Sequence, residues 1–191
     1  MYGSNVAAVG PDGLALFSAV HDSPAGATTF SNLMTYPSGT NNPALSREAV
    51  VRNIQLGLTY KDPVGLNRPI RYDTLIVSPS NFDLAIRLTQ TDKIPEGIEN
   101  DTNAFLRGRL KVVVWEKLET RTGGTDTSGY WYLCDSKKIG ESLKSVFAQK
   151  PELAPPATAP ANSNWTWKLD YFYSIHRGWP YGLRGSTGAG A

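Results

Sequence analysis

Two stretches of the chain carry hydrophobic residues at helical spacing. The first follows Asn42, which can cap a helix, and Pro43, whose missing N–H is harmless in the first helical turn. The second follows Ser80 or Asn81, either of which can cap a helix. The sequence therefore predicts two amphipathic helices, one from position 42 and one after position 81. Their apolar stripes are Val50, Val51, Ile54 and Leu58 in the first helix and Phe82, Ala85, Ile86 and Leu88 in the second.

Continuous or β-branched apolar runs predict the strands. Residues 75–77 form a short run typical of a strand buried on both faces, and Pro79 ends it. Residues 109–118 and 129–135 flank a Gly-rich turn, which predicts that they pair as antiparallel neighbours. Residues 138–147 fit a short helix or a further strand, and the pattern leaves both open.

The two ends of the chain have a different character. Residues 1–42 are rich in Gly, Ser, Asn, Thr and Pro, which predicts an extended segment that needs a surface absent from the sequence. Residues 149–164 are proline-rich and predict a loop or linker. Residues 165–176 alternate as in a strand, although Phe172 interrupts the polar side. Since the strands follow the helices, the predicted fold class is α+β. The side chains expected on one side of the last strand are Trp165, Trp167, Leu169, Tyr171, Tyr173 and Ile175.

The amino-acid composition indicates a hydrophobic core and a surface with few charged residues. Hydrophobic residues make up 40 % of the chain, whereas charged residues make up 19 %, below the roughly 25 % of typical soluble domains. Such a surface is typical of a protein covered by partner subunits. The net charge of +2 is too small to indicate nucleic-acid binding, and no apolar run is long enough to span a membrane. The single cysteine, Cys134, excludes an internal disulfide and lies in an aromatic run that predicts a small buried residue rather than a nucleophile.

Few residues suggest catalysis or ligand binding. Ser18, His21 and an acid such as Asp22 would form a hydrolase triad only if the fold brought them together, and their spacing does not require it. His176 is the only other histidine, and neither has the spacing of a metal ligand, so no metal or cofactor is predicted. Five tryptophans could stack on bases of a single-stranded nucleic acid, but few basic residues accompany them.

An acidic loop follows the second predicted helix. Residues 91–103 mix acids with one lysine, and two arginines lie just beyond. This composition has three interpretations: a solvated loop, a weak cation site or a contact between subunits. The charged residues are Asp92, Lys93, Glu96, Glu99, Asp101, Arg107 and Arg109.

The segment GPDGLALFSAVHDSP, residues 10–24, resembles a segment of tailed-phage major capsid proteins, most closely the Mu-type major head subunit branch. Asp22 and Ser23 separate His21 from Pro24, which is a small departure from that pattern. The likeness continues in order along the chain to residue 186, and the order of several moderate matches gives it weight. The matching residues of the first segment are Asp12, Gly13, Leu16, Phe17, Ser18 and His21, and the later matching segments are 42–55, 71–88, 110–118, 129–152 and 167–186.

The resemblance implies the Hong Kong 97-type capsid fold. Residues 1–42 would be an extended part of the peripheral domain, residues 43–161 mostly the axial domain, and residues 162–191 a return strand of the peripheral domain with a flexible tail. The N-terminal arm, extended hairpin loop and long spine helix that precede this region in the family are missing from these 191 residues. His21 would then be a packing residue, and the acidic loop would lie at an axial edge between subunits.

The function that the resemblance implies is structural. The chain would be a major capsid protein that assembles as hexamers and pentamers into an icosahedral shell around double-stranded DNA, without sequence-specific contact. It would be made in the bacterial cytoplasm and reside in the virion, with portal, scaffold or decoration proteins as further partners and with no membrane, cofactor or enzymatic activity. The alternatives are an encapsulin-like nanocompartment shell, a small serine hydrolase built on Ser18 and His21, and a single-strand nucleic-acid binder.

Overall fold

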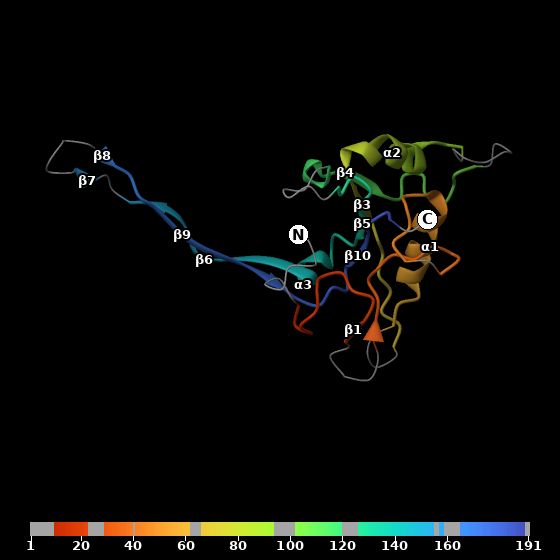
Figure 1. Ribbon diagram of the computed structural model, residues 1–191, viewed down its shortest axis with the longest axis horizontal. Helices are drawn as coiled ribbons and strands as arrows, with labels where there is room; N and C mark the ends of the chain where they lie inside the picture. Colours follow the sequence, from red (N-terminus) through yellow and green to blue (C-terminus); the bar gives the residue numbers. More distant parts are fainter. Residues whose placement is uncertain are drawn as a thin grey trace.

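The structure, a computed structural model, describes residues 10–22, 29–39, 41–61, 66–93, 102–119, 126–154, 157–158 and 165–189. Within these residues the fold is α+β, as predicted, with three helices, a mixed four-strand sheet and a long two-strand hairpin (Figure 1). The helices are α1 (Arg47–Leu58), α2 (Phe82–Gln90) and α3 (Ile139–Ser142), with 3-10 turns η1 (Pro79–Asn81) and η2 (Glu116–Leu118). The strands are β1 (His21–Asp22), β2 (Thr29–Phe30), β3 (Thr74–Val77), β4 (Lys111–Val114), β5 (Trp131–Cys134), β6 (Leu143–Leu153), β7 (Ala157–Thr158), β8 (Trp165–Thr166), β9 (Leu169–Arg177) and β10 (Leu183–Ser186).

The four-strand sheet has the order β10-β5-β3-β4. β3 and β4 run parallel because α2 carries the chain across the sheet between them. β5 pairs antiparallel with the other side of β3, so the prediction that β4 and β5 are neighbours is wrong. The connection over residues 115–130 is long enough for the chain to pass β3 instead of turning back beside β4. Leu75 and Val77 are fully buried, but Ile76 on the opposite face is half-buried, so only one face of β3 has the expected cover.

The main core lies between that face and helices α1 and α2. α2 begins at Phe82, as predicted, and its residues Ala85 and Leu88 are buried. Trp131 is fully buried, and its indole N–H donates to the carbonyl of Pro43 over 2.9 Å. The core residues are Ala49, Val50 and Ile54 from α1, Ala85 and Leu88 from α2, and Leu75, Val77, Trp131 and Leu133 from the sheet.

The segment before α1 lies along strand β10. Gly185 in β10 donates its N–H to the carbonyl of Asn32 over 3.1 Å and accepts from the N–H of Met34 over 2.9 Å. Met34 and Leu16 are buried. The segment therefore packs on the chain's own sheet, and for its described residues the prediction that it needs a surface absent from the sequence is wrong.

Helix α1 begins later than the sequence predicts. Its N-cap is Ser46, whose hydroxyl accepts from the N–H of Ala49 over 3.3 Å. Asn42 has a φ of 60° and cannot continue into a helix. Pro43 is held outside the helix because its carbonyl accepts hydrogen bonds from the sheet. Tertiary contacts at position 43 thus override a local start signal.

Strands β6 and β9 form an antiparallel hairpin that projects far from the sheet, with β7 and β8 at its outer end (Figure 1). Residues 138–147 hold both structures that the sequence leaves open, because β6 follows directly on α3. β6 then continues through residues 149–153, where the sequence predicts a loop or linker, and there that prediction is wrong.

Two irregularities in β6 explain why a proline-rich segment can be a strand. The register shifts once between Phe147 and Gln149 and again between Gln149 and Glu152. Pro151, which has no N–H to donate to a partner strand, lies within the second shift. The irregularities therefore place the proline where the ladder is already interrupted.

Replacing Ser46 by Ala is expected to lower the free energy of unfolding by about 1 kcal/mol, because the N–H of Ala49 loses its capping acceptor. Asn42→Gly is the matched control and should leave stability nearly unchanged, since glycine tolerates a φ of 60°. Urea unfolding followed by circular dichroism measures both. Equal stability of Ser46→Ala and the parent chain would mean that the helix begins elsewhere.

Candidate interaction surfaces

His21 lies in a buried hydrogen-bond network, with 1 % of its surface exposed. Its Nδ1 lies 2.6 Å from Oδ2 of Asp12, and its Nε2 lies 3.2 Å from Oδ1 of Asn32. The backbone orients the Asn32 amide: Oδ1 accepts from the N–H of Ser18 over 2.9 Å, and Nδ2 donates to the carbonyl of Leu16 over 2.6 Å. Both ring nitrogens of His21 therefore face oxygen atoms, the Asp12 carboxylate on one side and the Asn32 amide on the other.

The components of a hydrolase triad are not joined in this network. The Ser18 hydroxyl accepts from the N–H of Val20 over 3.2 Å, and within the described part of the chain no hydrogen bond links it to His21. The acid paired with His21 is Asp12, whereas the side chain of Asp22 lies outside the described structure. His176 is exposed on the hairpin, far along the chain from this network.

The His21 ring also belongs to an aromatic stack. It stacks on Phe30 at a ring-centroid distance of 5.2 Å, and Phe30 stacks on Tyr181 at 5.1 Å. Trp179 continues the stack at 6.1 Å from Tyr181. The stack joins the N-terminal segment to the residues that lead into β10, which is a packing role for His21.

Two further polar or reactive side chains are held inside the fold. Cys134 is buried, as predicted, and burial raises the pKa of its thiol. Burial lowers the pKa of the Arg184 guanidinium, and the nearby Tyr72 and Tyr60 oppose that shift. Nη2 of Arg184 donates to the carbonyl of Leu33 over 2.9 Å, which adds a further link between β10 and the N-terminal segment.

The acidic loop is only partly described. Nε of Arg107 lies 2.8 Å from Oδ1 of Asp92, and both side chains are more than half exposed. The guanidinium of Arg109 lies 4.6 Å from the ring centroid of Phe105. Lys93 forms an isolated backbone bridge with Thr102. The structure thus brings Asp92 and Arg107 together within one chain, whereas Glu96, Glu99 and Asp101 lie outside the described residues.

The β6–β9 hairpin has one apolar and one mostly polar face. Register pairs place Phe147 opposite Tyr173 and Leu153 opposite Leu169 on the same face. The other face pairs Lys144 with His176 and Glu152 with Asp170, and it also carries Val146 and Phe172. We call the first of these the apolar hairpin face, and its residues are Phe147, Leu153, Leu169, Tyr171, Tyr173 and Ile175, each between 48 % and 58 % exposed.

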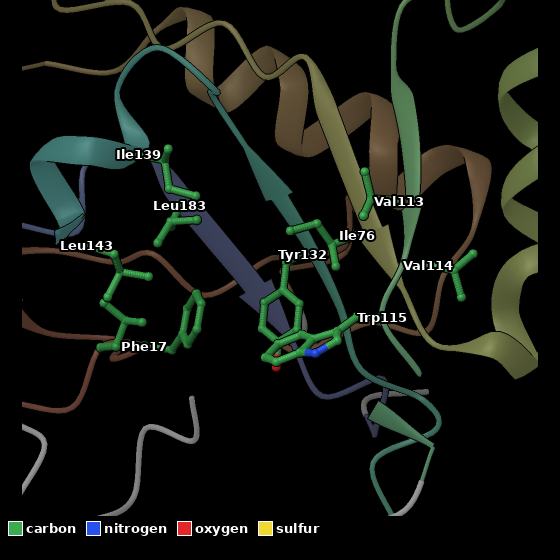
Figure 2. A pocket seen from close by; sticks show the side chains of 10 residues that line it. Phe17, Ile76, Val113, Val114, Trp115, Tyr132, Ile139, Leu143 and Leu183 are labelled. Atoms are coloured by element: carbon green, nitrogen blue, oxygen red, sulfur yellow. The ribbon is translucent and has the colours of Figure 1, made fainter. Parts of the chain in front are cut away.

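A cavity of about 310 Å³ opens at the base of the hairpin, on the face of the sheet that α1 and α2 do not cover. Figure 2 shows Phe17, Ile139, Leu143 and Leu183 of β10 on one side of it, and Ile76, Val113, Tyr132 and Trp115 on the other. Its lining is apolar, and it contains no titratable group except the Tyr132 phenol. We call it the base cavity, and its residues are Leu16, Phe17, Ile76, Val113, Val114, Trp115, Tyr132, Ile139, Leu143 and Leu183.

The sequence predicts four of the six residues of the apolar hairpin face, and it does not predict the base cavity. The alternation in β9 predicts the four residues Leu169, Tyr171, Tyr173 and Ile175, and the structure confirms that they share a face. The register shifts hide the contribution of β6. The base cavity is lined by residues of the N-terminal segment, of α3 and of strands from three parts of the chain, so no local sequence pattern predicts it.

No protein-family model and no curated protein matches this sequence. Among the described residues, no three His, Cys, Asp or Glu side chains gather in a way that could hold a metal ion. In the same residues no helix has the length and apolar character needed to cross a membrane.

His21→Ala is expected to lower the free energy of unfolding by about 1 to 3 kcal/mol, because it leaves the Asp12 carboxylate buried without its hydrogen-bond partner Nδ1. The double variant Asp12→Ala with His21→Ala should lose less than the two single losses added together, which denaturant unfolding can measure. His176→Ala on the exposed hairpin is the control and should change stability by no more than about 0.5 kcal/mol. An equally small effect of His21→Ala would contradict the structural role.

Proposed function

We propose that this chain is a major capsid protein of a tailed phage, with the Hong Kong 97-type capsid fold. It assembles with copies of itself, as hexamers and pentamers, into an icosahedral shell that encloses double-stranded DNA in the virion. Its role is structural rather than catalytic, and neither a metal nor a cofactor takes part. The sequence resemblance over residues 10–186 and the surface of the hairpin support this proposal.

The observation that carries the proposal is the apolar hairpin face. A two-strand hairpin is marginally stable in water by itself, and this one projects away from the four-strand sheet (Figure 1). Six large apolar side chains on one face of it are about half exposed. Monomeric soluble proteins seldom show an apolar patch of this size unless another surface covers it. In a subunit whose surface is mostly interface, neighbouring subunits would cover such a face.

The buried position of His21 and the low charge of the chain also suit a shell subunit. Both nitrogens of His21 are engaged by Asp12 and Asn32, which favours packing over a serine-hydrolase triad. A net charge of +2 suits a wall that contains DNA without binding it tightly. An encapsulin-like compartment would share the fold and the interfaces, and differs in what it encloses.

Electron microscopy of the protein purified from a producing bacterium tests the proposal directly. Uniform closed shells are the expected result, and a monodisperse monomer at every concentration would overturn it. Shells isolated from cells in which the complete phage replicates should protect double-stranded DNA from nuclease, whereas an encapsulin-like compartment should not. Labelling by a serine-reactive fluorophosphonate that is lost in Ser18→Ala would favour the hydrolase instead.

The acidic loop supplies a second, finer prediction about assembly. In a ring, one contact repeats around the axis, so acids on one subunit should face bases on the next. Each exposed pair contributes only about 0.2 to 1 kcal/mol, but the ring repeats it five or six times. Changing Arg107 and Arg109 to Glu should therefore reduce shell yield, and reduce it more at low salt, because salt screens the new repulsion.

Asp92→Asn is the matched control for that experiment, because it removes the internal pair with Arg107 without reversing a charge. It should leave shell yield nearly unchanged at both salt concentrations. Yield is measured as the fraction of protein that sediments as shells. Normal shells from the double arginine variant at low salt would remove the loop and both arginines from the interface.

A further inference from the structure

The base cavity and the apolar hairpin face adjoin on one side of the hairpin, and we call the two together the apolar strip. Ser145 and Arg177 lie on the same side, where the two parts meet. Leu143 lines the cavity, and it lies on the same side of β6 as Phe147 because residues 143–147 pair with β9 without a register shift. β6 has 11 residues, so at roughly 3.3 Å per residue the hairpin part of the strip is about 35 Å long. Whatever covers the strip must therefore be long and narrow.

The area of the strip matches one side of a protein interface. A fully buried aromatic side chain accounts for roughly 150 to 250 Å², so a half-exposed one presents on the order of 100 Å². The apolar hairpin face, with the 59 % exposed Trp167 at its outer end, therefore offers on the order of 700 Å². Each partner of a standard-size interface buries about 800 Å².

The two ends of the strip are complementary in shape. One end is hollow, because the base cavity has a volume of about 310 Å³ and, apart from the Tyr132 phenol and the Trp115 indole N–H, its lining side chains are apolar. The other end is bulky, because Leu153, Leu169 and Trp167 are all exposed there. A surface that is hollow at one end and bulky at the other can pack against a copy of itself that runs in the opposite direction.

We propose that a second copy of this chain covers the strip, with the two hairpins packed face to face and antiparallel about a two-fold axis near Phe147 and Tyr173. Leu153 and Leu169 of each copy then enter the base cavity of the other. The polar residues on the opposite face, such as Lys144 and His176, stay in water. This inference rests on the proposed function, since it names one contact through which a self-assembling subunit meets its neighbour.

Disulfide cross-linking tests the position of the axis. The experiment uses the whole chain with Cys134→Ala, which removes the one natural thiol. Tyr173→Cys lies near the axis and should form a covalent dimer within minutes of mild oxidation. Ser174→Cys, one residue away on the opposite face, is the matched control and should stay unlinked. Equal linking of the two variants, or no linking of Tyr173→Cys, would overturn the proposal.

A mixed cross-link tests the antiparallel packing. When Leu169→Cys and Val113→Cys proteins are combined, a disulfide should join the hairpin end of one copy to the base cavity of the other. Two hairpins packed in the same direction would give linked Leu169→Cys homodimers instead, and that result would overturn the arrangement. A strip covered by a helix would leave Tyr173→Cys and the mixed pair unlinked, and would overturn it as well.

Sedimentation velocity measures the strength of the contact. Tyr171→Lys with Tyr173→Lys places two charges in the face and should raise the dimer dissociation constant roughly 30-fold or more, the change expected when an interface loses a hot-spot residue. Asp170→Lys with Ser174→Lys on the opposite face should change it less than about threefold. An unchanged melting temperature shows that the core of the face variant is intact, and a dissociation constant equal to that of the parent would overturn the inference.

The two proposals fail in distinguishable ways. Closed shells without the Tyr173→Cys cross-link would contradict the proposed interface but would support the shell function. A cross-linked two-fold dimer that never forms shells would support the proposed interface but would contradict the shell function.

Discussion

Gly185 is the point at which three parts of the chain meet, and the rest of the structure depends on that close approach. A Cβ at this position would lie 2.8 Å from ring carbons of Phe17 and 3.0 Å from Cδ1 of Tyr132. With no side chain in the way, the backbone of residue 185 bonds to Asn32 and Met34 on one side while β10 pairs with β5 on the other. The absence of one carbon atom thus allows the N-terminal segment to lie against the sheet.

The buried polar network is a consequence of that approach. Once the backbone of Asn32 is fixed against Gly185, its side chain is positioned to bond to the backbone of Leu16 and Ser18 and to the ring of His21. Leu16 is then held in the wall of the base cavity. In the sequence, a histidine beside an acid is a candidate for catalysis. In the structure, His21 instead helps to hold the N-terminal segment, which forms part of the wall of the base cavity.

How much of this could be foreseen depends on whether the information is local. The strand at residues 75–77, the helix after Asn81 and the alternation in β9 are local patterns, and the sequence predicts them correctly. The pairing of β3 between β4 and β5 is not local, and neither is the capture of the Pro43 carbonyl by Trp131 that delays α1. For the outer part of β6, residues 149–153, the sequence predicts a loop instead of a strand, because its proline and its irregular register erase the period of two. The base cavity has no sequence pattern because residues distant along the chain line it.

The order of the strands along the chain has a consequence for synthesis. β5 pairs with β10, but the whole hairpin stands between them in the sequence, so one edge of β5 has no partner until β10 leaves the ribosome. The N-terminal segment waits for the same residues, since its backbone partner is Gly185. At about 5 to 20 residues per second, the roughly 50 residues between the two strands take several seconds to emerge. During that interval the nascent chain exposes an unpaired strand edge and an apolar hairpin together, and a chaperone bound at that stage would shield both.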